Sequence, residues 1–114
     1  MSDSRILQLL EEINNILRKH NVQQWLGVLT DIANNWKKAE DSGSSKRVLD
    51  MADEILSLYG GMGSLTDLYI SDRAGDDIAP RDIHAVNSRL QALRHALYLE
   101  AKRKLDDHEA SSGE

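Results

Sequence analysis

A cluster of glycines in the middle of the chain is the first candidate for chemistry, because glycine-rich loops can bind phosphates. Three glycines fall within four residues: Gly60, Gly61 and Gly63. A phosphate-binding P-loop needs the spacing GxxxxGK[ST], in which the lysine reaches the phosphates. The stretch GGMGSLTD has neither this spacing nor a lysine, and Asp67 and Asp72 would repel a phosphate. We therefore expect no nucleotide site at these glycines.

The same glycines suit a turn of the backbone. Gly60 follows the last apolar position of a helical pattern, where a left-handed residue ends many helices. Glycine also lets the chain reverse without a Cβ clash. Ser64 lies three residues before Asp67, a spacing typical of a helix N-terminus, so we expect a single helical turn there. The residues DLYIS that follow favour an extended backbone. The structural turn is assigned to four residues: Gly60, Gly61, Gly63 and Ser64.

Carboxylates gather between residues 53 and 82 and form the second candidate site. This segment has seven acidic side chains and only two basic ones, Arg73 and Arg81. Such an excess of acids repels a nucleic-acid backbone and attracts a basic protein surface. A solvated acidic loop is the alternative interpretation. The candidate partner-binding residues are Asp53, Glu54, Asp67, Asp72, Asp76, Asp77 and Asp82.

The remaining polar residues show no pattern typical of catalysis or metal binding. The four histidines form no HExxH motif, and His84 and His95 are too far apart on one helix to share a metal ion. No serine has the GxSxG setting of a nucleophile. We expect His20 to end the first helix, where a cation suits the helix dipole. We therefore expect no catalytic residue, no metal and no cofactor.

Composition indicates the class of protein. The chain has 114 residues, of which 40% are hydrophobic and 29% charged, with a net charge of −5 and no cysteine. These values are typical of one soluble globular domain without a disulfide framework. No apolar run approaches the ~20 residues of a membrane span, and the N-terminus lacks a signal-peptide pattern. We therefore expect a cytoplasmic protein that binds neither a membrane nor nucleic acid.

Four amphipathic patterns predict the fold, because apolar residues recur at helical spacing in four segments. These segments are 4–20, 22–41 with Asn21 as its N-cap, 45–59 and 80–104. The predicted fold is an all-α four-helix bundle, with the glycine-rich turn and a short extended segment between helices 3 and 4. Residues 1–105 form a single helical domain, and 106–114 form a flexible acidic tail. The expected core residues are Trp25, Leu29, Trp36, Ile55, Leu90, Leu93 and Leu97.

Two motifs resemble a family of small bacterial proteins with an uncharacterised domain. The first is a GGMGS-[LF]-x-D-L hallmark, present here as Gly60, Gly61, Met62, Gly63, Ser64, Leu65, Asp67 and Leu68. The second is an N-x-R-L element in the last helix, present here as Asn87, Arg89 and Leu90. The resemblance extends over about residues 22–104. Small all-helical bacterial proteins of this kind look like immunity proteins, which neutralise a co-encoded toxin by binding it.

The leading functional hypothesis is therefore a binding protein and not an enzyme. We expect a bacterial immunity protein whose acidic surface occupies the basic cleft of a cognate toxin, such as a nuclease, by electrostatic complementarity. The alternative is an oligomeric helical adaptor or regulatory protein, in which the last helix pairs with a second copy to form a homodimer. The apolar residues that favour this pairing are Leu97, Leu99, Ala101 and Leu105.

Overall fold

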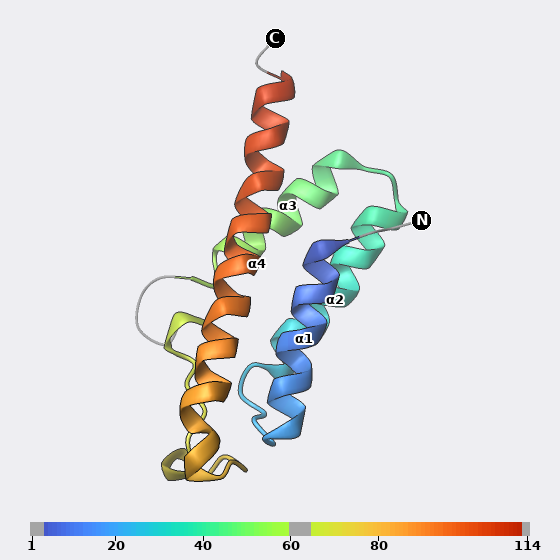
Figure 1. The fold of residues 1–114 in the computed structure, drawn as a ribbon. Coiled ribbons are helices and arrows are strands. Elements are labelled where there is room, and N and C mark those ends of the chain that lie inside the picture. The colour runs from blue at the N-terminus through green and yellow to red at the C-terminus, as the bar shows by residue number, and fades with distance from the viewer. Residues whose placement is uncertain (1–3, 60–64, 113–114) are drawn as a thin grey trace.

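The structure, a computed structural model, describes residues 4–59 and 65–112 (Figure 1). Within these ranges the chain forms four α-helices and three short 3-10 helices, and no strand. The α-helices are α1 (Arg5–Lys19), α2 (Leu26–Asp41), α3 (Ser45–Leu56) and α4 (Ile83–Ser112). The 3-10 helices are η1 (Leu65–Asp67), η2 (Asp72–Ala74) and η3 (Pro80–Asp82). The predicted all-α four-helix bundle is confirmed.

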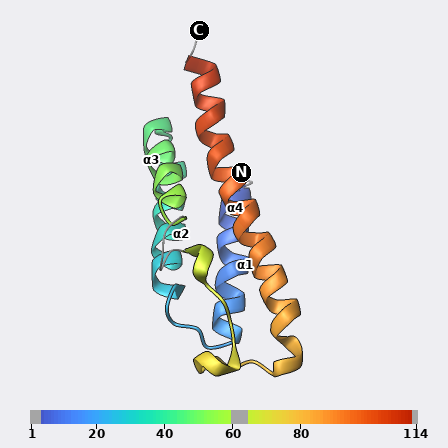
Figure 2. The same cartoon turned by 90° about the vertical axis from the view of Figure 1, so that its left-hand side faces the viewer.

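The helices surround one core, because α1 and α3 each pack against both α2 and α4. Residues 65–82, which we call the connector, run beside the N-terminal half of α4 and turn into its first residue (Figures 1 and 2). The end of the bundle at which α4 begins is called the foot.

Ser4 links the start of α1 to the core. Its hydroxyl oxygen accepts a hydrogen bond from the Leu7 N–H at 3.3 Å, as expected of an N-cap. The same oxygen accepts a second bond from the indole Nε1–H of Trp36 at 3.0 Å. Trp36 is fully buried, and a buried indole needs an acceptor for its N–H. The hydroxyl oxygen of one serine therefore accepts hydrogen bonds both from the first turn of α1 and from the largest side chain of the core.

Asn21 ends α1, so the prediction that it caps the second helix is wrong. Its φ is +55°, in the left-handed region that asparagine tolerates better than most residues. The Asn21 N–H bonds to the Arg18 carbonyl at 3.2 Å, and the Val22 N–H bonds to the Leu17 carbonyl at 2.8 Å. These are the two hydrogen bonds of a Schellman motif. Consequently α2 begins only at Leu26.

Six of the seven predicted core residues are buried: Leu29, Trp36, Ile55, Leu90, Leu93 and Leu97. Trp25 is the exception, because it is only half-buried and packs against the edge of the core. It directly precedes the first residue of α2, and the late start of this helix leaves Trp25 at the helix end and not along its buried stripe.

Helix α4 is longer than the apolar periodicity predicts. It has 30 residues, against 12 to 16 in the other α-helices, and its last part projects beyond them (Figure 1). The predicted end at Lys104 is wrong, since the helix continues to Ser112. Arg103 supports this extension, with ion pairs to Glu100 at 3.7 Å and Asp107 at 3.9 Å. The flexibility of residues 106–114 stays a prediction. No described helix combines the length and the apolar content needed to cross a bilayer.

Candidate partner-binding surface

Asn87 on α4 holds the connector against the helix. Its Oδ1 accepts a hydrogen bond from the Ile70 N–H, and its Nδ2 donates to the carbonyl oxygens of Ile70 and Ile83, each at 2.8 Å. Ile70 is fully buried, and buried backbone groups need hydrogen-bond partners. The asparagine of the N-x-R-L element is therefore a clamp that fixes the backbone of the connector.

Arg94 and Tyr59 hold the chain on both sides of the glycine cluster. Arg94 Nη1 donates to the carbonyl oxygens of Leu65 and Leu68 at 3.0 and 2.7 Å. The Tyr59 hydroxyl donates to the Arg94 carbonyl at 2.7 Å, and burial raises the pKa of Tyr59 well above its usual value.

The single helical turn that the sequence predicts after the glycines is the 3-10 helix η1. The predicted turn residues Gly60, Gly61, Gly63 and Ser64 lie outside the described residues.

His20 joins the end of α1 to the connector. Its side chain is buried, and its Nδ1 lies 2.8 Å from the carbonyl oxygen of Asp77. Because a carbonyl oxygen only accepts, Nδ1 carries the hydrogen of this bond. The Asp77 N–H donates in return to the His20 carbonyl at 2.9 Å. The sequence predicted that His20 ends the first helix. It did not indicate the contact of His20 with Asp77, which lies 57 positions away.

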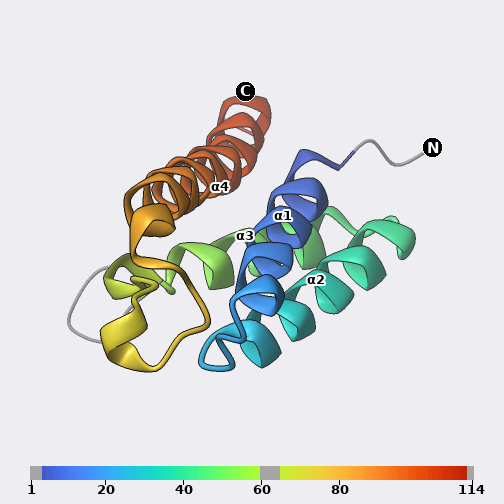
Figure 3. The same ribbon diagram turned by 60° about the horizontal axis from the view of Figure 1, so that its bottom comes forward.

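The stretch from η2 to η3 lies at the foot (Figure 3). Three of the predicted acids in this stretch are exposed: Asp72, Asp77 and Asp82. None of them forms an ion pair within residues 4–59 and 65–112. Two exposed cations, Arg73 and Arg81, share this stretch of chain. With Asp76 included, carboxylates outnumber guanidinium groups here by two. The foot therefore presents an excess of negative charge to solvent.

The other predicted acids lie elsewhere or have a structural role. Asp76 is half-buried, and its Oδ2 accepts a hydrogen bond from the Ser71 N–H at 3.0 Å, which stabilises the turn around η2. Asp53 and Glu54 are exposed on α3, which packs away from the foot (Figures 1 and 2). Asp67 is the last residue of η1. Asp53 and Glu54 therefore lie apart from the three acids exposed at the foot, so the candidate acids do not form a single surface.

Tyr69 is a surface residue that the sequence reasoning did not select. It is 59% exposed, whereas its neighbours Leu68 and Ile70 are 6% and 0% exposed. Successive side chains of an extended segment alternate in direction, so burial of both neighbours turns the tyrosine outward. Tyr69 lines a cavity of about 190 Å³ with His84 and Ser88 of α4. The alternation in LYI was the signal that could have identified it. We call Tyr69, Asp72, Asp77 and Asp82 together the foot surface.

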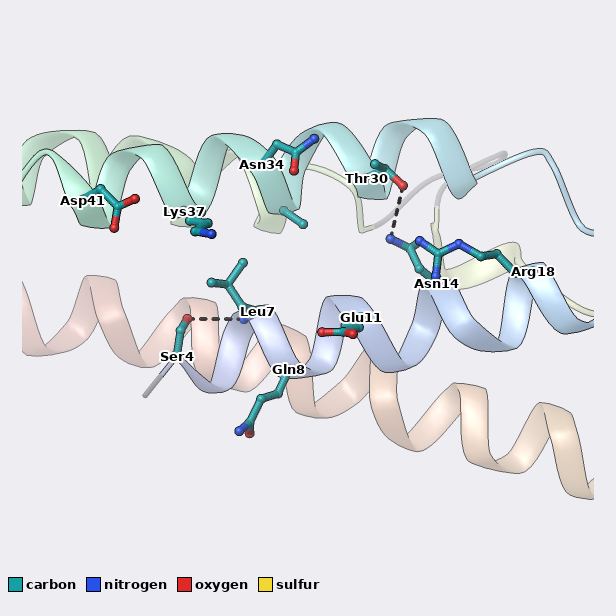
Figure 4. Close-up of a pocket in the computed structure, with 11 residues that line it drawn as sticks. Ser4, Leu7, Gln8, Glu11, Asn14, Arg18, Thr30, Asn34, Lys37 and Asp41 are labelled. Atoms are coloured by element: carbon teal, nitrogen blue, oxygen red, sulfur yellow. Dashed lines mark hydrogen bonds between the residues drawn. The ribbon is translucent and has the colours of Figure 1, made fainter. Parts of the chain in front are cut away.

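A second hollow runs between α1 and α2, with a volume of about 520 Å³ (Figure 4). Asn14 reaches across it from α1, and its Nδ2 donates to the Thr30 hydroxyl at 3.4 Å. Asn14 Oδ1 is buried and has no hydrogen-bond partner among the described residues. The groove is lined by charges of both signs: Glu11, Arg18, Lys37 and Asp41. In the part of the chain that the structure describes, no three histidine or carboxylate side chains are close enough to hold a metal ion.

Residues 18–79 match the model of a family described as "Domain of unknown function (DUF6966)". The match covers more than half of the 114-residue chain, from the end of α1 through most of the connector. The chain belongs to this family. Membership of an uncharacterised family was predicted and is confirmed, whereas the hallmark pattern and the likeness to immunity proteins stay predictions. Searches of curated proteins and of solved structures returned no match.

Proposed function

We propose that this member of the DUF6966 family is a binding protein that docks a basic protein partner on its foot surface. One observation carries the proposal: Tyr69 is more than half exposed and lies beside His84 in the first turn of α4, at the end of the bundle that also has three exposed carboxylates. Tyrosine is enriched in protein interfaces and at their energetic hot spots. Exposed carboxylates accelerate encounter with a basic surface and select against acidic ones.

The fixed backbone of the foot surface supports the proposal. Asn87 clamps the residue after Tyr69 with hydrogen bonds of 2.8 Å. His20 clamps Asp77 through its ring and its carbonyl oxygen. These anchors come from two helices at opposite ends of the sequence. A surface that is held in place before binding loses little conformational entropy when a partner docks, so more of the contact energy appears as affinity.

In its specific form, the proposal is that of an immunity protein. The foot surface would cover a basic cleft on a toxin, such as the substrate cleft of a nuclease, and thereby exclude its substrate. Complementary charge makes this block fast to form. The proposal sets the encounter in the cytoplasm, the compartment that the cysteine-free sequence favours.

A second candidate function is a self-associating helical adaptor. It is favoured by Leu99 on the projecting helix α4, because 50% of this apolar side chain is exposed. The two candidates use different surfaces, since the foot surface lies at the start of α4 and Leu99 in its second half. Variants at one surface therefore leave the other intact.

The test compares two triple variants with the same change of charge. The foot variant carries Asp72→Lys, Asp77→Lys and Asp82→Lys, and the control carries Asp31→Lys, Asp53→Lys and Glu54→Lys. All six acids are exposed, so both variants should stay folded, which circular dichroism checks. Parent, foot variant and control are immobilised, and the proteins that each captures from a lysate of the source organism are quantified by mass spectrometry.

We expect a basic protein that the parent and the control retain and the foot variant loses. Its association rate with the parent should fall steeply between about 50 and 500 mM salt, since screening shortens the reach of exposed charges to a few ångströms. Equal capture by all three proteins, or equal loss from both variants, would show that position on the surface is irrelevant and would refute the proposal.

A further inference from the structure

The hollow between α1 and α2 contains a buried amide that is short of hydrogen bonds. An asparagine side chain has two donor hydrogens and an oxygen that accepts twice. The side chain of Asn14 is only 3% exposed, and among the described residues it makes a single bond, to the Thr30 hydroxyl at 3.4 Å. This bond is longer than the usual ~2.9–3.0 Å. A buried polar group without partners costs free energy, so a ligand that supplies the missing bonds is favoured.

The size and charge of the hollow indicate the class of ligand. Its volume of about 520 Å³ lies within the range of ~300–1,000 Å³ that is typical of ligand sites. The ionisable side chains that line it are two acids and two bases: Glu11, Asp41, Arg18 and Lys37. Glu11, Asp41 and Lys37 form no ion pair within residues 4–59 and 65–112. A phosphate would meet two carboxylates and a polyamine would meet two cations, so this balance favours a ligand with one charge of each sign.

The order of the side chains along α1 indicates the length of the ligand. Glu11, Asn14 and Arg18 follow one another along the hollow (Figure 4). At 1.5 Å per residue, Glu11 and Arg18 are about 10.5 Å apart along the helix axis, with Asn14 between them. A single amino acid carries its ammonium and carboxylate on one carbon atom and is too short to reach both. An extended peptide spans about 3.3–3.6 Å per residue, so three residues match this distance.

The chain itself shows how an asparagine binds an extended backbone. Asn87 accepts from the N–H of Ile70 with Oδ1 and donates to the carbonyl of Ile70 with Nδ2, each at 2.8 Å. Asn14 has the same two atoms available, because its long contact with Thr30 is weak and its Oδ1 has no partner among the described residues. Rotation about the Cβ–Cγ bond, a torsion with a broad distribution, turns Oδ1 from its buried position toward the hollow.

We propose that the hollow between α1 and α2 binds a short extended peptide of about three residues with free termini. Asn14 accepts a hydrogen bond from a main-chain N–H of the peptide and donates one to a main-chain carbonyl. The peptide ammonium lies beside Glu11. Its carboxylate lies beside Arg18, which uses one of its five N–H donors on Asn15 at 2.8 Å. The site is separate from the foot surface, which the connector and η3 provide.

Trialanine is the probe, because it has every group that the site recognises: a peptide backbone and two charged termini. Titration into the ¹⁵N-labelled chain is followed by NMR at the side-chain amide of Asn14. We expect a saturable shift with a dissociation constant below about 1 mM. N-acetylated trialanine and trialanine amide should each bind about threefold to fivefold more weakly, since pairs with exposed charges are weak. An Asn14 signal that does not move up to about 10 mM trialanine, or equal affinity for all three peptides, overturns the proposal.

Variants test the role of each anchor. Asn14→Leu replaces an under-bonded polar side chain by an apolar one of similar size, so it should stay folded, which circular dichroism checks. It should bind trialanine at least about tenfold more weakly, and affinity equal to the parent's overturns the proposal. Arg18→Gln should weaken binding about threefold to fivefold, whereas the control Arg47→Gln, exposed on α3, should not; equal affinities of these two variants also overturn it. The foot variant should bind trialanine like the parent, so this result is independent of partner docking.

Discussion

Replacing Asn87 with alanine should release the connector from α4. The change removes three hydrogen bonds of 2.8 Å, two to the backbone of Ile70 and one to the Ile83 carbonyl. A protein hydrogen bond contributes about 1 kcal/mol net, so we expect a loss of about 3 kcal/mol in the free energy of unfolding. Because Ile70 is fully buried, its N–H and C=O gain no water in exchange while the connector stays in place.

Urea unfolding followed by tryptophan fluorescence measures this loss, since Trp36 is buried in the core. For a slope of about 1.5 kcal/mol per M urea, 3 kcal/mol moves the midpoint by about 2 M. Asn34→Ala is the matched control, because Asn34 is exposed on α2 and should change stability by less than about 0.5 kcal/mol. If Asn87→Ala shifts the midpoint no more than Asn34→Ala, Asn87 does not clamp the connector and the argument for a pre-organised Tyr69 fails.

Three further predictions concern the core, the end of α1 and pH. Leu93→Ala should cost about 2–5 kcal/mol, because the side chain is buried in the core; a urea midpoint like that of the parent would remove Leu93 from the core. Asn21→Gly should be tolerated and Asn21→Val should destabilise, since φ at this position is +55°, and equal melting temperatures for the two variants would contradict the left-handed turn. Tyr59→Phe should destabilise at pH 8 by removing a hydrogen bond to the Arg94 carbonyl. Burial raises the pKa of Tyr59 in the folded state, so the neutral hydroxyl adds its full share to the free energy of unfolding below pH ~10, and this share is lost as pH rises further. If the free energies of unfolding of parent and variant differ by the same amount from pH 8 to pH 11, this reasoning is refuted.

The helices could be predicted because their signals are local. Apolar spacing identified all four, and Ser44 caps α3, with its hydroxyl accepting from the Arg47 N–H at 3.3 Å. Two helix ends were missed for physical reasons. Asparagine suits both an N-cap and a left-handed C-terminal position, so the identity of Asn21 did not decide between them. The end of α4 at Ser112 lies beyond the apolar pattern, so spacing alone could not place it.

The candidate site could be predicted only in part. The acids of residues 53–82 were visible in the sequence, but their division between the foot and α3 was not, because it depends on the path of the backbone. That path is fixed by side chains that bond to distant backbone groups, such as Asn87 to Ile70, 17 positions away. Residue types and spacing do not reveal such contacts. The exposure of Tyr69 follows from the same anchors.

Hydrogen exchange of the chain with and without its captured partner tests the central claim most directly, because it maps the docking surface without any substitution. Binding at the foot surface predicts slower exchange in peptides from the connector, residues 65–82, and from the first turns of α4. Peptides from α3 and from the groove between α1 and α2 should exchange at an unchanged rate. Slower exchange in α3 or in that groove, with the connector unaffected, would contradict the claim that the partner docks on Tyr69, Asp72, Asp77 and Asp82.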